Sequence, residues 1–476
     1  MPQWLGRYKW LWIAVAVMIS LFIFAACEDD DKEDGGDTPA AEETPPPADT
    51  SPLKIGLLFS YTGALGEFGP VHENAARLAV DEINAAGGVL GRQVDFELIP
   101  YVSADAPGQA DAGGPALGAT GQPIEIVTAD DATDPTQGTT EATRLIEVEG
   151  VDMILGALGS SVSVAIAESV TGPNSILQIS GASSSPALTL ADDDDFLFRT
   201  PIHDTAQGVV LSNLVREEGF DTVCNMYVNN AYGEALSDAF AQNFEEAGGT
   251  VTARVPHEDE QATYASELDT CLADSPDALA AIAYPTSAAT FLREAVERGD
   301  VENVLFVDGT KAPVMMTELG WANFDGMVGT APSSLDLPER DRFLAAYEAE
   351  YGEVPTVPYG PETYDAVYLA ALAAEAAGST DPTAMRDALR GIANPPGDTI
   401  HPGGDGYTQA KGILAGGGDI NYEGASGPVD LDENGDVLIG AVETYHVDGA
   451  AEAFVTDKVY KVDLTTGELE DITPAE

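Results

Sequence analysis

Two short serine-rich segments, Gly156–Ser163 and Ser180–Pro186, each follow an apolar stretch that is typical of a β-strand. In the first segment, Ser160 and Ser161 lie where a strand gives way to a helix, so that backbone N–H groups and hydroxyls can converge on an anion. Serine is also common as an ordinary helix N-cap, which makes either segment alone weak evidence. Two such loops at the ends of adjacent strands predict a cradle for a carboxylate group.

An aspartate ends a third apolar stretch, Val304–Asp308. A carboxylate at a strand end over a dry cleft would make a strong charge-assisted hydrogen bond. Asp308-Gly309 is also an ordinary turn sequence that needs no ligand. The neighbouring Lys311 could pair with Asp308 itself, so both interpretations stay open on the residues alone.

Two tyrosines stand at the ends of further apolar stretches: Tyr232 follows Thr222–Val228, and Tyr284 ends Ala278–Tyr284. A single tyrosine in such a place is more often a packing residue than a ligand contact. Two of them at two strand ends favour a role in ligand binding.

Other motifs do not support catalysis or metal binding. The segment Asp430–Asp436, DLDENGD, begins like a calcium loop, but Leu438 and Ala441 occupy its ninth and twelfth positions. A hairpin turn at Glu433–Asp436 explains it better. The sequence has no nucleophile elbow, phosphate-binding loop or Cys/His pair. We therefore expect no enzyme, no cofactor and no metal site, since the five histidines also lack ligand spacing (His72, His203, His257, His401 and His446).

Strand-like and helix-like segments alternate along most of the chain, which predicts parallel sheets with helices on both faces. Ligands bind such sheets at the carboxyl ends of the strands. The expected strands are Lys54–Phe59, Val151–Leu155, Ile176–Ser180, Thr222–Val228, Thr250–Val255, Ala278–Tyr284 and Val304–Asp308. The expected helices include one that covers Val71–Ile83 and stops at Gly87-Gly88, and Ala231–Ala247, Tyr264–Leu272, Ser287–Gly299 and Pro361–Ala377.

Two glycine-rich stretches do not fit this alternation. Tyr101–Gln122 is rich in Gly, Ala and Pro, and we expect a surface insertion there, either a tolerated loop or a mobile flap. Asn394–Gly418, which contains His401, is expected to be a long loop.

The net charge of the 476-residue chain is −61, with only 20 lysines and arginines against 81 acidic residues. Such a surface repels nucleic acid and anionic lipid, so we expect no nucleic-acid partner. An acidic, lysine-poor surface is also what a salt-rich habitat favours.

The N-terminus resembles a bacterial lipoprotein signal. Arg7 and Lys9 precede an apolar run, Trp10–Phe24, and small residues lead to Cys27. This resemblance implies a signal peptide over residues 1–26 and a lipid on the Cys27 sulfur; a transmembrane anchor is the alternative, although the run is short for a span. Residues 27–52 then form a tether, because residues 28–52 hold ten acidic residues and almost no bulky apolar side chain.

With Cys27 lipidated, Cys224 and Cys271 remain as a pair. An exported location permits a disulfide between them, and neighbouring elements could bring them together. Two buried free thiols are the alternative.

The opening of the folded part carries a family resemblance. KIGLLFSYTG (Lys54–Gly63) followed by AVDEINAAGGVLGR (Ala79–Arg92) resembles the start of type I periplasmic binding proteins of branched-chain amino-acid ABC transporters. The resemblance covers nearly all of residues 53–445. It implies an α/β fold of two Rossmann-like lobes joined by a three-crossing hinge, with lobe 1 at 53–203 plus 333–441 and lobe 2 at 204–331 plus 442–476.

The same resemblance implies roles for individual residues. Ser160 and Ser184, with Ser161 adjacent, would hold the carboxylate of a ligand. The carbonyl of Ala182 and the carboxylate of Asp308 would accept hydrogen bonds from its ammonium group. The aromatic side chains would cover it from the cleft walls (Phe68, Tyr232 and Tyr284).

The implied function is an extracytoplasmic, lipid-anchored binding protein that passes an amino acid, or a related small carboxylate or amide, to ABC permease subunits. It would touch the membrane only through the Cys27 lipid, on the outer face of the cytoplasmic membrane. The alternative is a ligand-sensing domain that feeds a signalling partner, because relatives with this fold serve both purposes.

Overall fold

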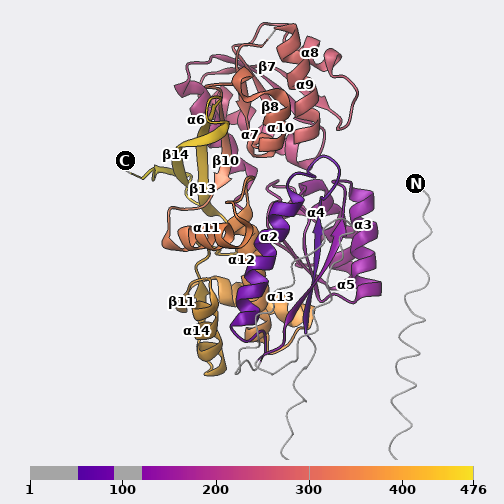
Figure 1. Cartoon of the computed structure of the whole chain (residues 1–476), viewed down its shortest axis with the longest axis vertical. Coiled ribbons are helices and arrows are strands. Elements are labelled where there is room, and N and C mark those ends of the chain that lie inside the picture. The colour runs from indigo at the N-terminus through magenta and orange to yellow at the C-terminus, as the bar shows by residue number, and fades with distance from the viewer. Residues whose placement is uncertain (1–51, 91–120, 300, 475–476) are drawn as a thin grey trace, which may run out of the picture. The chain divides into compact units, whose positions relative to one another are not determined.

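The structure is a computed structural model, and it describes residues 52–90, 121–299 and 301–474. The chain divides into two units, Met1–Pro47 and Ala48–Glu476, and the fold described here is that of the second unit (Figure 1). The lipoprotein-like signal, Cys27, most of the tether and most of the expected insertion Tyr101–Gln122 lie outside the described residues.

The first sheet has five parallel strands in the order β2-β1-β3-β4-β5. Alternate residues of β1 face opposite sides of it. Leu57 and Phe59 join the cluster that contains the α2 side chains, whereas Leu58 joins the cluster with α3 and α4. Helices therefore cover both faces, which explains why β1 is an unbroken apolar run. Its strands are β1 (Leu53–Phe59), β2 (Ile124–Asp130), β3 (Met153–Gly156), β4 (Leu177–Ser180) and β5 (Leu197–Arg199).

The second sheet has eight strands in the order β15-β14-β13-β10-β9-β8-β6-β7. The part from β7 to β10 is parallel, but β10, β13, β14 and β15 pair antiparallel. The expectation of purely parallel sheets is therefore wrong at this edge, because β13, β14 and β15 follow one another without intervening helices. The strands are β6 (Thr222–Val228), β7 (Thr250–His257), β8 (Ala278–Ile282), β9 (Val304–Phe306), β10 (Val328–Ser333), β13 (Ile439–Asp448), β14 (Ala453–Asp463) and β15 (Glu468–Asp471).

The helices lie between these strands in the chain. Beside the first sheet are α2 (Gly69–Ala85), α3 (Pro135–Arg144), α4 (Ser160–Ile166) and α5 (Gly172–Asn174). The next group follows β5: α6 (Asp204–Glu217), α7 (Ala231–Glu246), α8 (Ala265–Cys271), α9 (Pro285–Arg298) and α10 (Pro313–Leu319). The last group is α11 (Pro338–Tyr351), α12 (Gly360–Ala377), α13 (Pro382–Ala393) and α14 (Gly404–Ala415).

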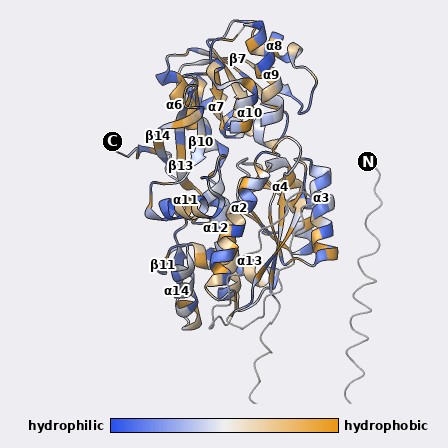
Figure 2. Cartoon of the chain, in the orientation of Figure 1, coloured by the Kyte–Doolittle hydropathy of each residue, from blue (hydrophilic) through white to orange (hydrophobic). Residues whose placement is uncertain are grey.

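The main hydrophobic core runs through both sheets and centres on α12 in the part near the first sheet. Fourteen α12 residues are buried, and the helix packs against α2 and α13. In Figure 2 the outer helix α3 carries much hydrophilic colour, in keeping with the threonine-rich sequence of its exposed face.

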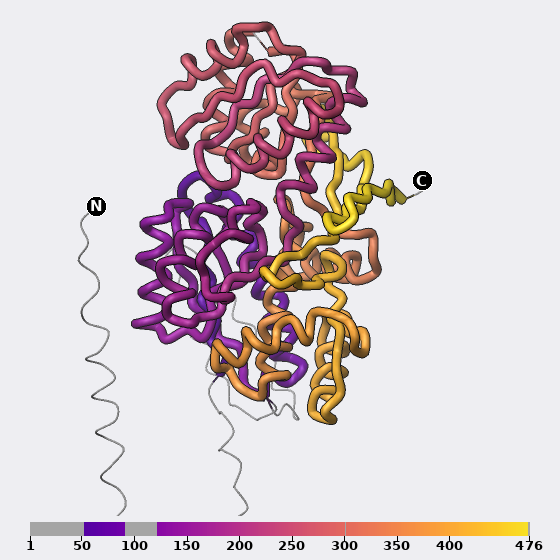
Figure 3. The backbone as a smooth tube through the Cα atoms, turned by 180° about the vertical axis from the view of Figure 1, so that it is seen from behind, coloured from indigo at the N-terminus to yellow at the C-terminus, as the bar shows by residue number. Residues whose placement is uncertain are grey.

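Three segments link the two sheets. Residues 200–203 lead from β5 into α6, residues 334–337 lead from β10 to α11, and the stretch before β13 returns to the second sheet. They lie side by side, since Ile202 bridges to Val437 and Ser333 pairs with Ala441. Figure 3 shows the yellow C-terminal segment beside the chain near residue 330. The exact lobe boundaries stay a prediction.

The prediction of a long loop at Asn394–Gly418 is wrong. The segment contains β11 (Asp398–Ile400), which pairs with β12 (Ile420–Tyr422), and the helix α14. Tyr407 of α14 is fully buried, and its hydroxyl donates to Glu375 of α12 at 3.1 Å. Packing against α12 and α2 thus stabilises a helix that its glycine content disfavours.

The strand β2, which follows the expected insertion, was not predicted from the sequence. It pairs with β1 along its whole length. Only the end of the segment Tyr101–Gln122 is described, and there Val89 and Gln122 form an isolated bridge. The turn expected within Asp430–Asp436 is present: the Asp432 amide donates to the carbonyl of Asp436 at 3.0 Å, and Leu431 pairs with Val437.

Cys224 on β6 and Cys271 on α8 form a disulfide, with their Cα atoms 5.6 Å apart. Both residues are fully buried. Among the residues that the structure describes, no helix has the length and apolar character needed to span a membrane.

Candidate functional site

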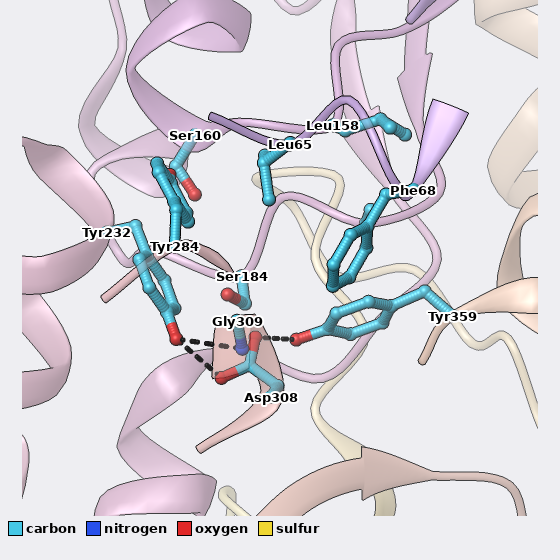
Figure 4. A pocket seen from close by; sticks show the side chains of 11 residues that line it. Leu65, Phe68, Leu158, Ser160, Ser184, Tyr232, Tyr284, Asp308, Gly309 and Tyr359 are labelled. Atoms are coloured by element: carbon cyan, nitrogen blue, oxygen red, sulfur yellow. Dashed lines mark hydrogen bonds between the residues drawn. The ribbon is translucent and has the colours of Figure 1, made fainter. Parts of the chain in front are cut away.

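A pocket lies where the carboxyl ends of strands from both sheets meet (Figure 4). The first sheet supplies the segments after β1, β3 and β4, and the second supplies those after β6, β8 and β9. Its empty space, including the open mouth and the adjoining solvent, is about 310 Å³. The lining residues are Leu65, Phe68, Leu158, Ser160, Ala182, Ser184, Tyr232, Tyr284, Asp308, Gly309 and Tyr359.

The serine side of the pocket is built on the loops after β3 and β4. Ser160 begins α4, and its hydroxyl accepts a hydrogen bond from the Ser185 amide at 3.2 Å, which ties the two loops together. Below them, Ser163 and Ser183 bond to each other at 2.8 Å, and Ser180 donates to the carbonyl of Ala157 at 2.7 Å. This buried network fixes the loops, so that Ser160 and Ser184 can present hydroxyls to a ligand.

Asp308 forms the opposite side. It follows β9 and is 4% exposed. Tyr232 donates to one carboxylate oxygen at 2.6 Å, and Tyr359 donates to the other at 2.8 Å, as Figure 4 shows. Burial raises the pKa of Asp308, and the two tyrosine hydroxyls oppose that rise. Asp308 thus has the donors needed to hold a buried negative charge.

Aromatic rings form the walls. Tyr232 and Tyr284 stack with their ring centroids 5.3 Å apart. Across the pocket, Phe68 stacks on His72 at 6.3 Å, and His72 is held by a 2.6 Å hydrogen bond to Thr363. Burial lowers the pKa of His72 to about 3, so this ring is neutral and serves as packing.

A second buried acid, Asp204, lies beside the pocket at the start of α6. Its backbone amide donates to the carbonyl of Ser184 at 2.8 Å. Burial, followed by the charge of Asp308, raises its pKa well above the usual range. The nearby Arg199 is buried, but its guanidinium binds Asp436 at 2.7 Å and the carbonyl of Ser185 at 2.8 Å.

The pocket brings together most of the residues predicted for ligand binding. Ser160, Ser184 and Asp308 line it, as do the other predicted residues Ala182, Tyr232, Tyr284 and Phe68. Ser161 is next to them in the chain but is not part of the lining. Lys311 does not pair with Asp308; its ammonium group contacts Glu443 of β13 instead.

Four contributors were not predicted from the sequence: Leu65, Leu158, Tyr359 and the neighbouring Asp204. Tyr359 precedes α12 rather than ending a strand, so the rule that located the other tyrosines could not find it. Its backbone has φ +71°, an uncommon left-handed conformation for a non-glycine residue. The signal in the sequence was its setting, a tyrosine between Pro358 and Gly360 at the start of a helix.

The lining offers hydroxyls, one carboxylate and aromatic rings, which suits a small molecule with both an anionic and a cationic group. Within the described ranges, no group of three or more His, Cys, Asp or Glu side chains is arranged to hold a metal ion.

Comparison with known proteins agrees with this geometry. A family model described as periplasmic binding protein matches residues 52–114 and 104–414. The chain is 28% identical over 396 residues to the chemotactic signal transduction system substrate-binding protein BasB of Halobacterium salinarum, covering 80% of this chain and 83% of BasB. It is 25% identical over 351 residues to the leucine-, isoleucine-, valine-, threonine- and alanine-binding protein of Pseudomonas aeruginosa, covering 72% of this chain and 83% of that protein.

Solved structures show the same fold. The leucine-binding protein LivK of Thermotoga maritima superposes with a TM-score of 0.67 at 23% identity, covering 86% of this chain and 98% of its own. A solute-binding protein of an ABC transporter from R. palustris, in complex with benzoate, superposes with a TM-score of 0.62 at 18% identity, covering 89% of this chain and 96% of its own. The chain therefore belongs to the periplasmic binding protein family, as a type I member related to the proteins that bind branched-chain amino acids.

Proposed function

We propose that this chain is the extracytoplasmic solute-binding component of an ABC importer and that it binds an amino acid, or a related small carboxylate or amide, in the pocket between its lobes. One observation carries the proposal: serine hydroxyls from the first sheet face a buried Asp308 from the second sheet across a small pocket. Membership of a family of two-lobed solute-binding proteins supports the proposal, and so do the amino acids in the name of the Pseudomonas aeruginosa relative.

The ligand would contact both lobes. Ser160 and Ser184, with Ser161 adjacent, would bind its carboxylate from lobe 1, while Asp308 of lobe 2 and the carbonyl of Ala182 of lobe 1 would bind its ammonium group. The side chain would then lie among Tyr232, Tyr284 and Phe68. Because the ligand would join the two lobes, binding would favour their closure by hinge motion.

The chain would be attached to the outer face of the cytoplasmic membrane. Residues 1–26 would be removed as a signal peptide, Cys27 would carry the lipid, and residues 27–52 would tether the folded part near its permease. A Cys27→Ser variant would then incorporate no labelled fatty acid and would be released or left unprocessed. Unchanged fatty-acid labelling of that variant would contradict this anchor.

A thermal-shift screen tests the binding proposal. A ligand at 100 times its Kd stabilises the folded state by about 2.7 kcal/mol. The panel contains L-leucine, L-alanine, leucinamide, 4-methylpentanoate and benzoate, so that each charged end of the ligand is present in some compounds and missing from others. Stabilisation by at least one of these small molecules is expected. No shift with any amino acid, amide or carboxylate would count against the proposal.

Sensing is the second candidate function, and the similarity to BasB, a chemotactic substrate-binding protein, favours it. The ligand pocket would be the same, but a signalling protein would replace the permease. Deletion of the gene separates the two: loss of uptake of the labelled ligand indicates import, while normal uptake with loss of the behavioural response indicates sensing.

A further inference from the structure

Asp204 is a buried acid that the proposed function leaves without a role. It is the first residue of α6, and its side chain is fully buried. Among the described residues, neither carboxylate oxygen has a hydrogen-bond partner, although the nearby Ser184 hydroxyl and Arg199 both lower its pKa. An ionised carboxylate in this setting would be costly, because burial removes its hydration and no hydrogen bond from the described residues replaces it.

Asp308 has the opposite surroundings. Tyr232 and Tyr359 each donate a short hydrogen bond to it. Gln207, one helical turn beyond Asp204 on α6, also lowers the pKa of Asp308, while its amide donates to the carbonyl of Thr330 at 3.0 Å. Two neighbouring carboxyl groups therefore differ sharply in the number of donors that they receive. When two acids share a buried site, the one with more donors ionises and the other keeps its proton.

The other titratable groups around Asp204 do not change this assignment. Arg199 on β5 favours the ionised form, but its own charge is matched by Asp436. Burial lowers the pKa of the adjacent His203 to about 4, so it is neutral at pH 7. The strands packed against α6 contribute Glu443 on β13, which pairs with Lys311. Asp432 acts on Arg199 and His203. Three tyrosines that feel the charge of Asp204 have a pKa that burial raises further above neutrality (Tyr232, Tyr284 and Tyr359).

We propose that Asp204 is the protonated partner of Asp308, so that this buried acid pair presents one negative charge to a singly charged ammonium group of the ligand. The inference rests on the proposed function and narrows it to ligands that carry an amino group. A ligand with a carboxylate alone, such as benzoate, would leave the charge of Asp308 unmatched. Asp204 acts here as a positioning residue, since it sets the charge of the pair through Asp308.

The pH dependence of unfolding tests the proton on Asp204 without any ligand. In the unfolded chain Asp204 ionises near its usual pKa of 3.8, whereas in the folded protein it stays protonated well above that value. Between these values the folded state holds one more proton, so rising pH destabilises it. Each unit of rising pH then increases the equilibrium constant for unfolding by up to tenfold.

The measurement compares the full-length wild type with Asp204→Asn and Asp308→Asn, at constant salt, between pH 5 and pH 8. Asparagine has the shape of a protonated aspartate but cannot ionise. The equilibrium constant for unfolding of the wild type relative to Asp204→Asn should rise at least tenfold across this range. A ratio that does not change with pH overturns the proposal.

Ligand binding supplies the second measurement, with L-leucine and its deaminated analogue 4-methylpentanoate as probes in calorimetry. Asp308→Asn should weaken the binding of L-leucine at least tenfold more than Asp204→Asn does, because only Asp308→Asn removes the negative charge of the pair. Equal losses in the two variants would mean that Asp204 is itself ionised, against the proposal. If the wild type binds no member of the screening panel, the proposed function fails, while the unfolding data still decide the state of Asp204.

Discussion

Glu67 makes a contact across the pocket mouth that should strengthen ligand binding without touching the ligand. It lies in the loop after β1, and its carboxylate accepts a hydrogen bond from the Val314 amide of α10 at 2.7 Å. Burial raises the pKa of Glu67, and the amides of Val314 and Met315 oppose the rise. Because the two segments belong to different sheets, we expect this contact only when the lobes are closed.

The size of the effect follows from the setting of Glu67. A hydrogen bond to a charged group contributes about 1.5–3 kcal/mol. Glu67 is only partly buried, so solvent screening reduces the contribution to about 1 kcal/mol. Glu67→Ala should therefore raise the Kd of the bound amino acid about fivefold, and Glu67→Gln, which keeps an acceptor oxygen, should raise it less.

Calorimetry with the best ligand from the thermal-shift screen, starting with L-leucine, measures this change. Glu297→Gln is the matched control, since Glu297 is an exposed glutamate on α9 of the same lobe. The control should bind as the wild type does. A Kd for Glu67→Ala within twofold of the wild type would refute the role of this contact in closure.

Three further predictions concern the site, the disulfide and the surface charge. Asp308→Ala should weaken the binding of an α-amino acid by about 2–5 kcal/mol, roughly 30-fold or more, and the binding of an analogue without an ammonium group far less. Ser184→Ala should weaken the binding of any carboxylate ligand by about 1.5–3 kcal/mol. Calorimetry on both variants checks this, and wild-type affinity for an α-amino acid in Asp308→Ala would show that Asp308 does not bind the ammonium group. Reduction of the bond between Cys224 and Cys271, 47 residues apart, should lower the free energy of unfolding by about 2–4 kcal/mol in denaturant titrations, and equal stability with and without reductant would contradict it. The melting temperature should rise as salt is raised from low to molar concentration, because salt screens repulsion within a chain of net charge −61. A melting temperature that does not change with salt would contradict the hypothesis that the acidic surface is an adaptation to a salt-rich habitat.

The position of the pocket could be predicted from sequence because it depends on local patterns. In a parallel sheet the carboxyl ends of the strands meet at one edge, so loops after apolar runs must converge there. That rule indicated the two serine loops and the strand-end Asp308, while the family resemblance singled out Ser160 and Ser184 within the loops. Tyr232 and Tyr284 also follow apolar runs, and with the resemblance they were expected in the cleft; both line the same pocket.

Other contributors depend on contacts between distant parts of the chain. Tyr359 reaches Asp308 from the start of α12, 51 residues later, and no local pattern indicates that contact. The sequence predicts a loop where α14 forms because three glycines interrupt its twelve residues, whereas the burial of Tyr407 that stabilises the helix depends on distant parts of the chain. The antiparallel edge of the second sheet was missed for a similar reason, since strand direction is set by the partner strand.

The two rims of the pocket meet at more than one point. Besides Glu67 and Val314, the Ser185 hydroxyl donates to the carbonyl of Ala231 at 2.7 Å, which joins the loop after β4 to the start of α7. Under the proposed function, a membrane partner that touches both rims would detect closure rather than the ligand itself. Mutations inside the pocket would then change the ligand that is recognised and leave the surface that the partner contacts unchanged, so one partner would serve binding proteins of different specificity.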